Sequence, residues 1–430
     1  MWHHAHRVER WAASRVALAI AVAALAIDSW SSTATAETCV AKSSFGFDDP
    51  ERQRVNVQKL LELTQWLRDN PIPVLSLTVS RNGKVVYELY TSRVDRSAAH
   101  YVMSVTKSVT AALVGVAQDR KLIKAPDSSV ADNLPAAVFA TPQSLNRFKT
   151  VSVKDVLGMS ALDAPLTPHV KTPEAKARSD KFFDSANRLK FALEQATLPR
   201  VGKDFQYTDV TPIIAAGIVQ LATNKTLLDF GREVLFGPMG FENEEWMHQD
   251  GAGYDNASYG LRLRPIDMQK FGILFLNNGC WSGRQLISRS WVATSFKPWI
   301  KSNSNNREVN YGWYWWTDWF SSGWVGHTAN GWKGQRITAV PDKGVVVTMT
   351  GIVEDGTEST IYRDLFNRFI IPAIEMKPSP SMSMAEQKLR LATALKDISA
   401  NKTAFGPTTE SRMLPSVARK GTHKGFLRSH

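Results

Sequence analysis

Two stretches of the chain, one near each end, alternate apolar and polar residues as half-buried strands do. The first covers residues 75–89 and is broken by Asn82-Gly83, the dipeptide most typical of a tight β-hairpin turn. The second covers residues 336–347, with turn residues at 341–344. Both ends of the chain are therefore expected to contribute to one sheet.

Between the hairpins the apolar residues recur every three or four positions, which indicates helices. We therefore expect a sheet region over about 37–125 and 255–375, and a helical insertion over about 126–254. A closing helix that stops at Pro372 is expected to pack back on the sheet. The helices are predicted at 104–119, 153–159, 184–195, 211–222, 265–277 and 361–371.

The two ends differ in composition from this body. Residues 1–36 carry arginines, an apolar run from Val16 to Ile27 and a final Ala34-Thr35-Ala36, the pattern of a signal peptide cleaved after Ala36. An uncleaved anchor is the alternative, although the apolar run is short for a membrane span. Residues 376–430 are basic and polar, so we expect a largely disordered tail with one short amphipathic helix at 384–398.

Charge and cysteines narrow the class of protein. Of the net charge of +12, residues 376–430 carry +7 and residues 1–36 carry +1, which leaves +4 for the 339 residues between them. So small an excess favours solubility over nucleic-acid binding. Cys39 and Cys280 are the only cysteines, and export to a periplasmic or extracellular compartment would allow them to pair.

The main candidate for chemistry is Ser104-Val105-Thr106-Lys107 at the start of an apolar helix. Residues three apart share a helix face, so Lys107 can reach the Ser104 hydroxyl. Burial would lower the pKa of the lysine and let it take the serine proton. The pattern also occurs at 399–402, in the polar tail, where we ascribe it to chance. Without further matches, a serine that caps a helix would explain Ser104 equally well.

Two further segments can complete such a site. Tyr207 precedes the helix at 211–222, and a phenol beside an ammonium gives up its proton more readily, so Tyr207 is a candidate acid–base group. The run from Gly326 to Gly331, placed on an edge strand, would offer a backbone N–H to an oxyanion. Taken alone, Tyr207 is as well explained by packing, and His327 by an ordinary surface position.

In this order and spacing the three segments resemble the serine hydrolases related to class C β-lactamases, in the branch that contains the 6-aminohexanoate-dimer hydrolases. The resemblance runs from about Pro73 to Ile374. It implies an α/β fold of the β-lactamase/transpeptidase type, with a central antiparallel sheet flanked by helices and a mainly helical subdomain. Segments that carry it include Val151–Ser160, Tyr259-Gly260-Leu261, Gly283–Ile287, Tyr311–Trp316 and Gly331–Arg336.

The resemblance also implies roles. Ser104 would be acylated, Lys107 would activate it, and Tyr207 would shuttle protons. The N–H of Ser104 and one near Asn330 or Ala329 would hold the oxyanion. Asp209 replaces the asparagine of the Y-x-N motif, and His327-Thr328-Ala329, or the triplet one residue earlier, replaces K-T-G. We therefore expect Asp209 and His327 to face the substrate and to disfavour penicillins.

The expected activity is hydrolysis of carboxylic esters or linear amides, and the partner is then a small molecule. A D-alanyl-D-alanine peptidase, a β-lactamase or a penicillin sensor without turnover is the alternative. The histidines show no metal-ligand spacing, so neither metal nor cofactor is expected. Of the five tryptophans between Tyr311 and Trp324, most should be core residues and one should line the cleft.

Overall fold

The computed structural model describes residues 39–41, 44–70, 72–92, 94–163, 172–195, 197–199, 201–304, 307–354, 356–377 and 383–400. The predicted signal peptide, with its cleavage point, and residues 401–430 lie outside these ranges. Contacts within the chain divide it after Thr38, and everything below concerns the unit that begins at Cys39. None of the helices in the described ranges combines the length and the apolar character that a membrane crossing requires.

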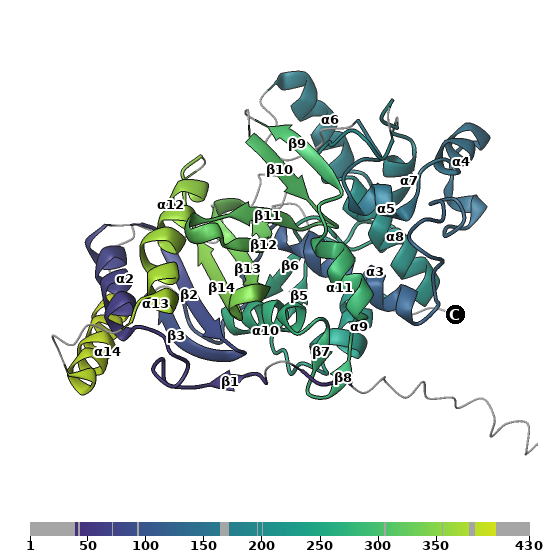
Figure 1. Cartoon of the computed structure of the whole chain (residues 1–430). Helices are drawn as coiled ribbons and strands as arrows, with labels where there is room; N and C mark the ends of the chain where they lie inside the picture. The colour runs from purple at the N-terminus through teal and green to yellow at the C-terminus, as the bar shows by residue number, and fades with distance from the viewer. Residues whose placement is uncertain are drawn as a thin grey trace, which may run out of the picture. The chain divides into compact units, whose positions relative to one another are not determined.

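A large sheet forms the centre of this unit and draws on both ends of the sequence (Figure 1). Its strand order is β1-β3-β2-β14-β13-β12-β11-β10-β9. All neighbours are antiparallel except β1 and β3, which confirms the predicted mainly antiparallel sheet. The strands are β1 (Gly46–Phe47), β2 (Val74–Arg81), β3 (Lys84–Tyr90), β9 (Ile300–Ser304), β10 (Arg307–Tyr311), β11 (Trp316–Trp319), β12 (Val325–Gly331), β13 (Gln335–Val340) and β14 (Val345–Gly351).

Both predicted hairpins are present, as β2–β3 and β13–β14. In the first turn Asn82 and Gly83 both have positive φ (49° and 74°), which Asn and Gly adopt at lower cost than other residues. In the second, Gly344 has φ 65° after Pro341–Lys343. Strands β2 and β14 then pair with each other, so the two hairpins join into one sheet.

Helices cover both faces of the sheet. On one face lie α2 (Val57–Asp69), α12 (Glu358–Leu365), α13 (Ile371–Glu375) and α14 (Met384–Ala400), and their apolar side chains share a core with β2 and β14. On the other face lie α3 (Val105–Asp119) and α10 (Pro265–Leu276). The predicted helical insertion supplies α4 (Pro142–Phe148), α5 (Val153–Leu157), α6 (Pro173–Phe183), α7 (Arg188–Leu193), α8 (Thr211–Thr223) and α9 (Leu227–Gly231).

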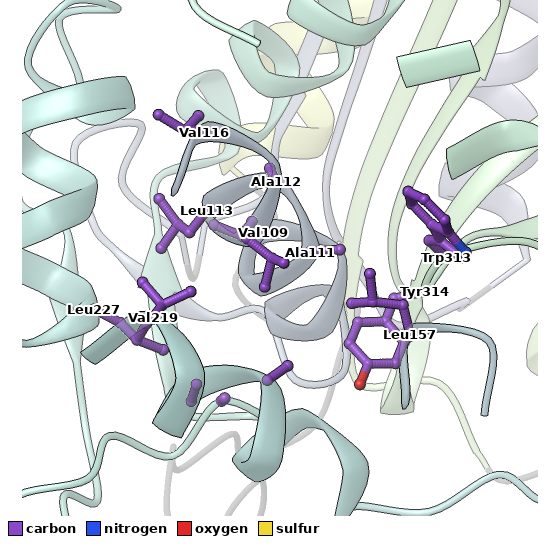
Figure 2. Packing of buried hydrophobic residues seen from close by; sticks show 14 of the residues in the cluster. Val109, Ala111, Ala112, Leu113, Val116, Leu157, Val219, Leu227, Trp313 and Tyr314 are labelled. Atoms are coloured by element: carbon purple, nitrogen blue, oxygen red, sulfur yellow. The ribbon is translucent and has the colours of Figure 1, made fainter. Parts of the chain in front are cut away.

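Helix α3 runs through the middle of the larger core. Nearly all of its side chains are buried, in contrast to a surface helix, which buries only one face. Figure 2 shows Leu113 of α3 on the side of Val219 and Leu227 of the insertion, while Trp313 and Tyr314 lie on the other side of α3. This packing fixes the position of the residues at the start of α3.

Near the C-terminus the structure corrects two predictions. The closing helix does not stop at Pro372: a π-helical turn, Phe366–Ile370, leads into α13, where Pro372 occupies the first turn and needs no N–H partner. The predicted helix at 384–398 is present as α14, but it is not peripheral. Leu391, Ala394 and Ile398 are buried in the core shared with α2, so the packed body extends beyond residue 375.

Cys39 and Cys280 form a disulfide, with Cα atoms 5.9 Å apart. Cys280 belongs to β7 (Cys280–Trp281), which follows α10. The bond fastens the first described residues to the body of the protein.

Candidate active site

Ser104 lies immediately before α3, at the point where the chain turns from β4 (His100–Tyr101) into the helix. The turn is made by Met103, whose φ of +49° falls in the left-handed region that side chains rarely occupy. Met103 is held there because its side chain is buried against Leu75 and Tyr101. Strain of this kind, stabilised by packing, is typical of functional sites.

Lys107 lies one helical turn after Ser104 and is buried, with 1% of its surface exposed. Its Nζ is 2.9 Å from Ser104 Oγ, 2.5 Å from Asp209 Oδ1 and 3.1 Å from the carbonyl oxygen of Ser258. An ammonium has three N–H groups, and these three acceptors satisfy all of them. The predicted contact between Ser104 and Lys107 is therefore present in the structure.

Asp209, which was expected from the sequence to lie at the substrate, has its carboxylate against Lys107. Its side chain is buried at 3% exposure and forms an ion pair with Lys107. The Ser258 hydroxyl donates a hydrogen bond of 2.6 Å to the Asp209 carbonyl, which fixes this part of the backbone. The carboxylate that replaces an amide at this position thus acts on the lysine instead of on a ligand.

This ion pair also corrects the expected charge of the lysine. Burial alone would lower the pKa of Lys107, but attraction to the Asp209 carboxylate, with a smaller contribution from Tyr207, outweighs burial. The pKa is raised above its usual 10.5 as a result. Lys107 is therefore an ammonium at neutral pH in the resting enzyme.

Tyr207 is brought to the same place by the loop before α8. Lys107 Nζ lies 5.1 Å from the centre of its half-buried ring. The ring packs against Trp316, with centroids 5.7 Å apart, and against Tyr311 at 6.4 Å. The structure therefore brings together the three residues that the sequence singled out, Ser104, Lys107 and Tyr207.

Trp316 is the tryptophan beside this site, which the sequence could not specify. It is half-buried, and Phe205, Tyr207 and Tyr311 all lie within 6.0 Å of it by ring centroids. Trp313, Trp315 and Trp324 are instead fully buried in the cores, and Trp319 is 50% exposed. Phe205, Tyr207, Tyr311 and Trp316 thus form an aromatic wall next to Lys107.

Strand β12 carries the predicted run Gly326–Gly331, but it is an inner strand, so the expected edge position is wrong for its first half. Its pairing with β11 ends at Thr328 opposite Trp316, whereas its pairing with β13 continues to Gly331 opposite Gln335. Only Ala329, Asn330 and Gly331 extend past the end of β11. A Cβ on Gly331 would lie 2.4 Å from the Val102 carbonyl oxygen, so this end of β12 lies close to the residues that precede Ser104. The backbone N–H of Ala329 or Asn330 is still the predicted second donor to the oxyanion.

His327 lies elsewhere, in the part of β12 that pairs with β11. Four residues separate it from Gly331, about 13 Å along an extended strand. Its ring stacks on Phe296 with centroids 4.1 Å apart, and burial lowers its pKa to about 4. His327 is therefore neutral at pH 7 and belongs to an aromatic layer, which corrects its predicted position at the substrate.

Sequence reasoning gave no role to Ser258, whose carbonyl oxygen holds Lys107. The contact uses a backbone atom, so the residue type carries no signal for it.

In the described ranges no three His, Cys, Asp or Glu side chains are grouped so that they could hold a metal ion. The second S-x-x-K copy begins at Ser399, which lies at the end of α14 and not at a helix start.

Comparison with known proteins places this geometry in a family. A curated 6-aminohexanoate-dimer hydrolase of Paenarthrobacter ureafaciens is 21% identical over 216 residues, which is 50% of this chain and 55% of that protein. The chain thus matches about half the length of that relative. Among solved structures, a Bacillus anthracis protein provisionally described as a 6-aminohexanoate-dimer hydrolase has a TM-score of 0.60 at 20% identity, over 74% of this chain and 82% of that one.

A class C β-lactamase has a TM-score of 0.54 at 15% identity, over 74% of this chain and 96% of that one. At these identities the structures show a shared fold. The family model for β-lactamase matches residues 54–362, a range that includes Ser104, Lys107 and Tyr207. The chain therefore belongs to the β-lactamase family, with a fold of the β-lactamase/transpeptidase type.

Proposed function

We propose that the protein is an exported serine hydrolase that cleaves carboxylic esters or linear amides through an acyl-enzyme on Ser104. The observation that carries the proposal is the 2.9 Å contact between Ser104 Oγ and Lys107 Nζ at the start of α3. A hydroxyl at the start of a helix lies at the positive end of the helix dipole. This favours the negative charge that develops when Oγ attacks a carbonyl.

Tyr207 is proposed as the group that passes a proton to the leaving alcohol or amine. Its ring lies beside Lys107 and is only half-buried, so its hydroxyl can serve both the lysine and a bound ligand. Water then attacks the acyl-enzyme, and the same groups act in reverse order.

The aromatic wall indicates the kind of acyl group. Phe205 and Trp316 are half-buried and present ring faces and edges that suit an apolar linear chain, while the buried Tyr311 ring packs against both. His327 is neutral and turned toward Phe296, so it provides no cation for the carboxylate of a penicillin. This supports an ester or linear amide over a β-lactam, and the 6-aminohexanoate dimer named for the relatives is a reasonable probe.

Export is part of the proposal. It is supported by the pattern of residues 1–36 and by the bonded pair Cys39–Cys280, since disulfides persist mainly in oxidising compartments. We therefore propose a periplasmic or secreted enzyme with residues 1–36 removed.

The test is to label the purified mature protein with a fluorophosphonate and to assay p-nitrophenyl esters, 6-aminohexanoate dimer and nitrocefin. We expect labelling and ester hydrolysis in the wild type, and a loss of activity of about 10⁴-fold or more in Ser104→Ala. Labelling that persists in Ser104→Ala would disprove the assignment of the nucleophile. Turnover of nitrocefin faster than of every ester would favour a β-lactamase.

A further inference from the structure

We propose that Asp209 is a positioning residue that acts through Lys107: it accepts a proton from Nζ so that Nζ can take the proton of Ser104. Ser104, Lys107 and Asp209 would then work as one proton-transfer chain. The inference rests on the proposed function, because it explains how a buried ammonium can activate the serine.

The geometry supports such a chain because Nζ donates to two oxygens that can both exchange a proton with it. Ser104 Oγ is at 2.9 Å and Asp209 Oδ1 at 2.5 Å, both within hydrogen-bond distance. The Ser258 carbonyl oxygen, at 3.1 Å, holds the third N–H and can only accept. Once Nζ has lost one proton, its lone pair can turn toward Ser104 while the Ser258 carbonyl and the Asp209 carboxyl still bind the amine.

The protons balance over the acylation step. A proton moves from the Lys107 ammonium to the Asp209 carboxylate, and the neutral amine then takes the Ser104 hydroxyl proton as Oγ bonds to the substrate carbonyl carbon. When the bond to the leaving group breaks, Nζ first gives up one proton toward the leaving group, and the proton held by Asp209 then returns to Nζ. The proton given up by Nζ passes, by way of Tyr207, to the leaving alcohol or amine. Lysine and aspartate end as they began, and the serine proton leaves with the product.

Burial lowers the cost of exchanging a proton within the pair. Lys107 and Asp209 are 1% and 3% exposed, so little water stabilises the separated charges. The groups that face the pair are phenols and hydroxyls. Tyr207 lies over Lys107, and Tyr259 and Tyr311, whose pKa values burial raises, interact with Asp209. Tyr259 and Tyr311 therefore stay neutral at pH 7 and do not replace Asp209 as the acceptor.

The experiment compares wild type, Asp209→Asn, Asp209→Glu and the control Asp255→Asn. Asp255 is also 3% exposed, but it binds the backbone N–H of Leu227 at 2.6 Å instead of Lys107. Burial raises its pKa to about 6, so the control also tests whether this carboxyl causes any acid limb in the rate profile. For each variant, kcat/KM for a p-nitrophenyl ester and the rate of fluorophosphonate labelling are measured from about pH 4 to about pH 10.

We expect the acid limb of kcat/KM to move up by about two pH units or more in Asp209→Asn. An amide cannot accept the proton, so this variant must first lose the proton of Lys107 to solvent. Asp209→Glu should have the acid limb at the same pH as the wild type, with a lower kcat/KM. Asp255→Asn should match the wild type in both the acid limb and kcat/KM. Thermal unfolding of each variant shows whether it is folded.

An acid limb that stays in place in Asp209→Asn would overturn the proposal, as would a limb that moves equally in Asp255→Asn. If Asp209→Asn does not fold, Asp209→Glu provides the test. An acid limb of kcat/KM that is displaced in Asp209→Glu, although the carboxylate is retained, would contradict the proposed proton-transfer chain. Failure of the proposed function gives a different result, because the wild type itself would then show no labelling that depends on Ser104.

Discussion

Two nitrogen bases, Lys107 and His327, show how differently this fold treats a titratable group. Lys107, at the start of α3, is surrounded by oxygen acceptors and pairs with Asp209. His327, on β12, lies flat on Phe296, and its Nδ1 has no hydrogen-bond partner among the described residues. Lys107 is buried and His327 is half-buried, and burial alone would favour the neutral form of both.

The comparison shows that the partner decides the charge. The carboxylate beside Lys107 outweighs burial and raises the pKa of the lysine, whereas the ring beside His327 offers no charge and burial lowers the pKa of the histidine to about 4. The Lys107 ammonium contacts two oxygens with which it can exchange protons. The neutral His327 ring is instead stacked on Phe296. Only the first environment therefore has the features of an active site.

The largest effect on activity and stability is expected when Lys107 is replaced. Lys107→Met should abolish ester hydrolysis and also lower the free energy of unfolding by about 3 kcal/mol or more, because it leaves the Asp209 carboxylate buried without a partner. Adding Asp209→Asn to this variant should restore much of the stability and none of the activity. Denaturant unfolding and p-nitrophenyl ester assays measure the two effects. Full stability in Lys107→Met alone would show that the ion pair contributes nothing to folding.

A smaller effect is expected at the aromatic wall. Trp316→Ala should raise KM about 10-fold for p-nitrophenyl hexanoate, with less effect on the acetate, because a ring contact of about 1 kcal/mol and its buried area are lost. Trp319→Ala is the matched control, since Trp319 lies on the same strand and is 50% exposed. Equal changes for both esters, or an equal change in the control, would remove Trp316 from the acyl site.

The smallest effect on activity is expected at His327. His327→Phe should leave kcat/KM within about twofold, because the ring lies far from Ser104. The acid stability should change instead. The pKa is about 4 in the folded protein and usually 6.5, so the unfolded chain binds the proton first and the wild type loses stability as pH falls from 6.5 toward 4.

In His327→Phe this part of the acid dependence should disappear, so its Tm should fall less than that of the wild type between pH 6.5 and 4. His248, whose pKa burial also lowers, is present in both proteins and cancels in the comparison. Identical pH dependence of Tm would mean that His327 is protonated as easily when folded as when unfolded.

Local patterns in the sequence were sufficient for the two hairpins and for the contact between Ser104 and Lys107. The two hairpins follow from alternation and from turn residues such as Asn82-Gly83, and these act over a few residues. The spacing of Ser104 and Lys107 is a property of one helix turn, so it too can be read locally. Pro372 misled the prediction because a π-helical turn before it removes the need for its missing N–H.

What the sequence by itself determined is therefore the two hairpins, several of the helices and the residue types at the start of α3. The tertiary structure decided what each side chain faces. It brought Asp209, 102 residues beyond Lys107, into contact with Nζ, and it buried His327 on Phe296. Charge state depends on burial and on the nearest partner, and long-range packing sets both. The same packing turned a lysine expected to be a neutral base into the ammonium of an ion pair.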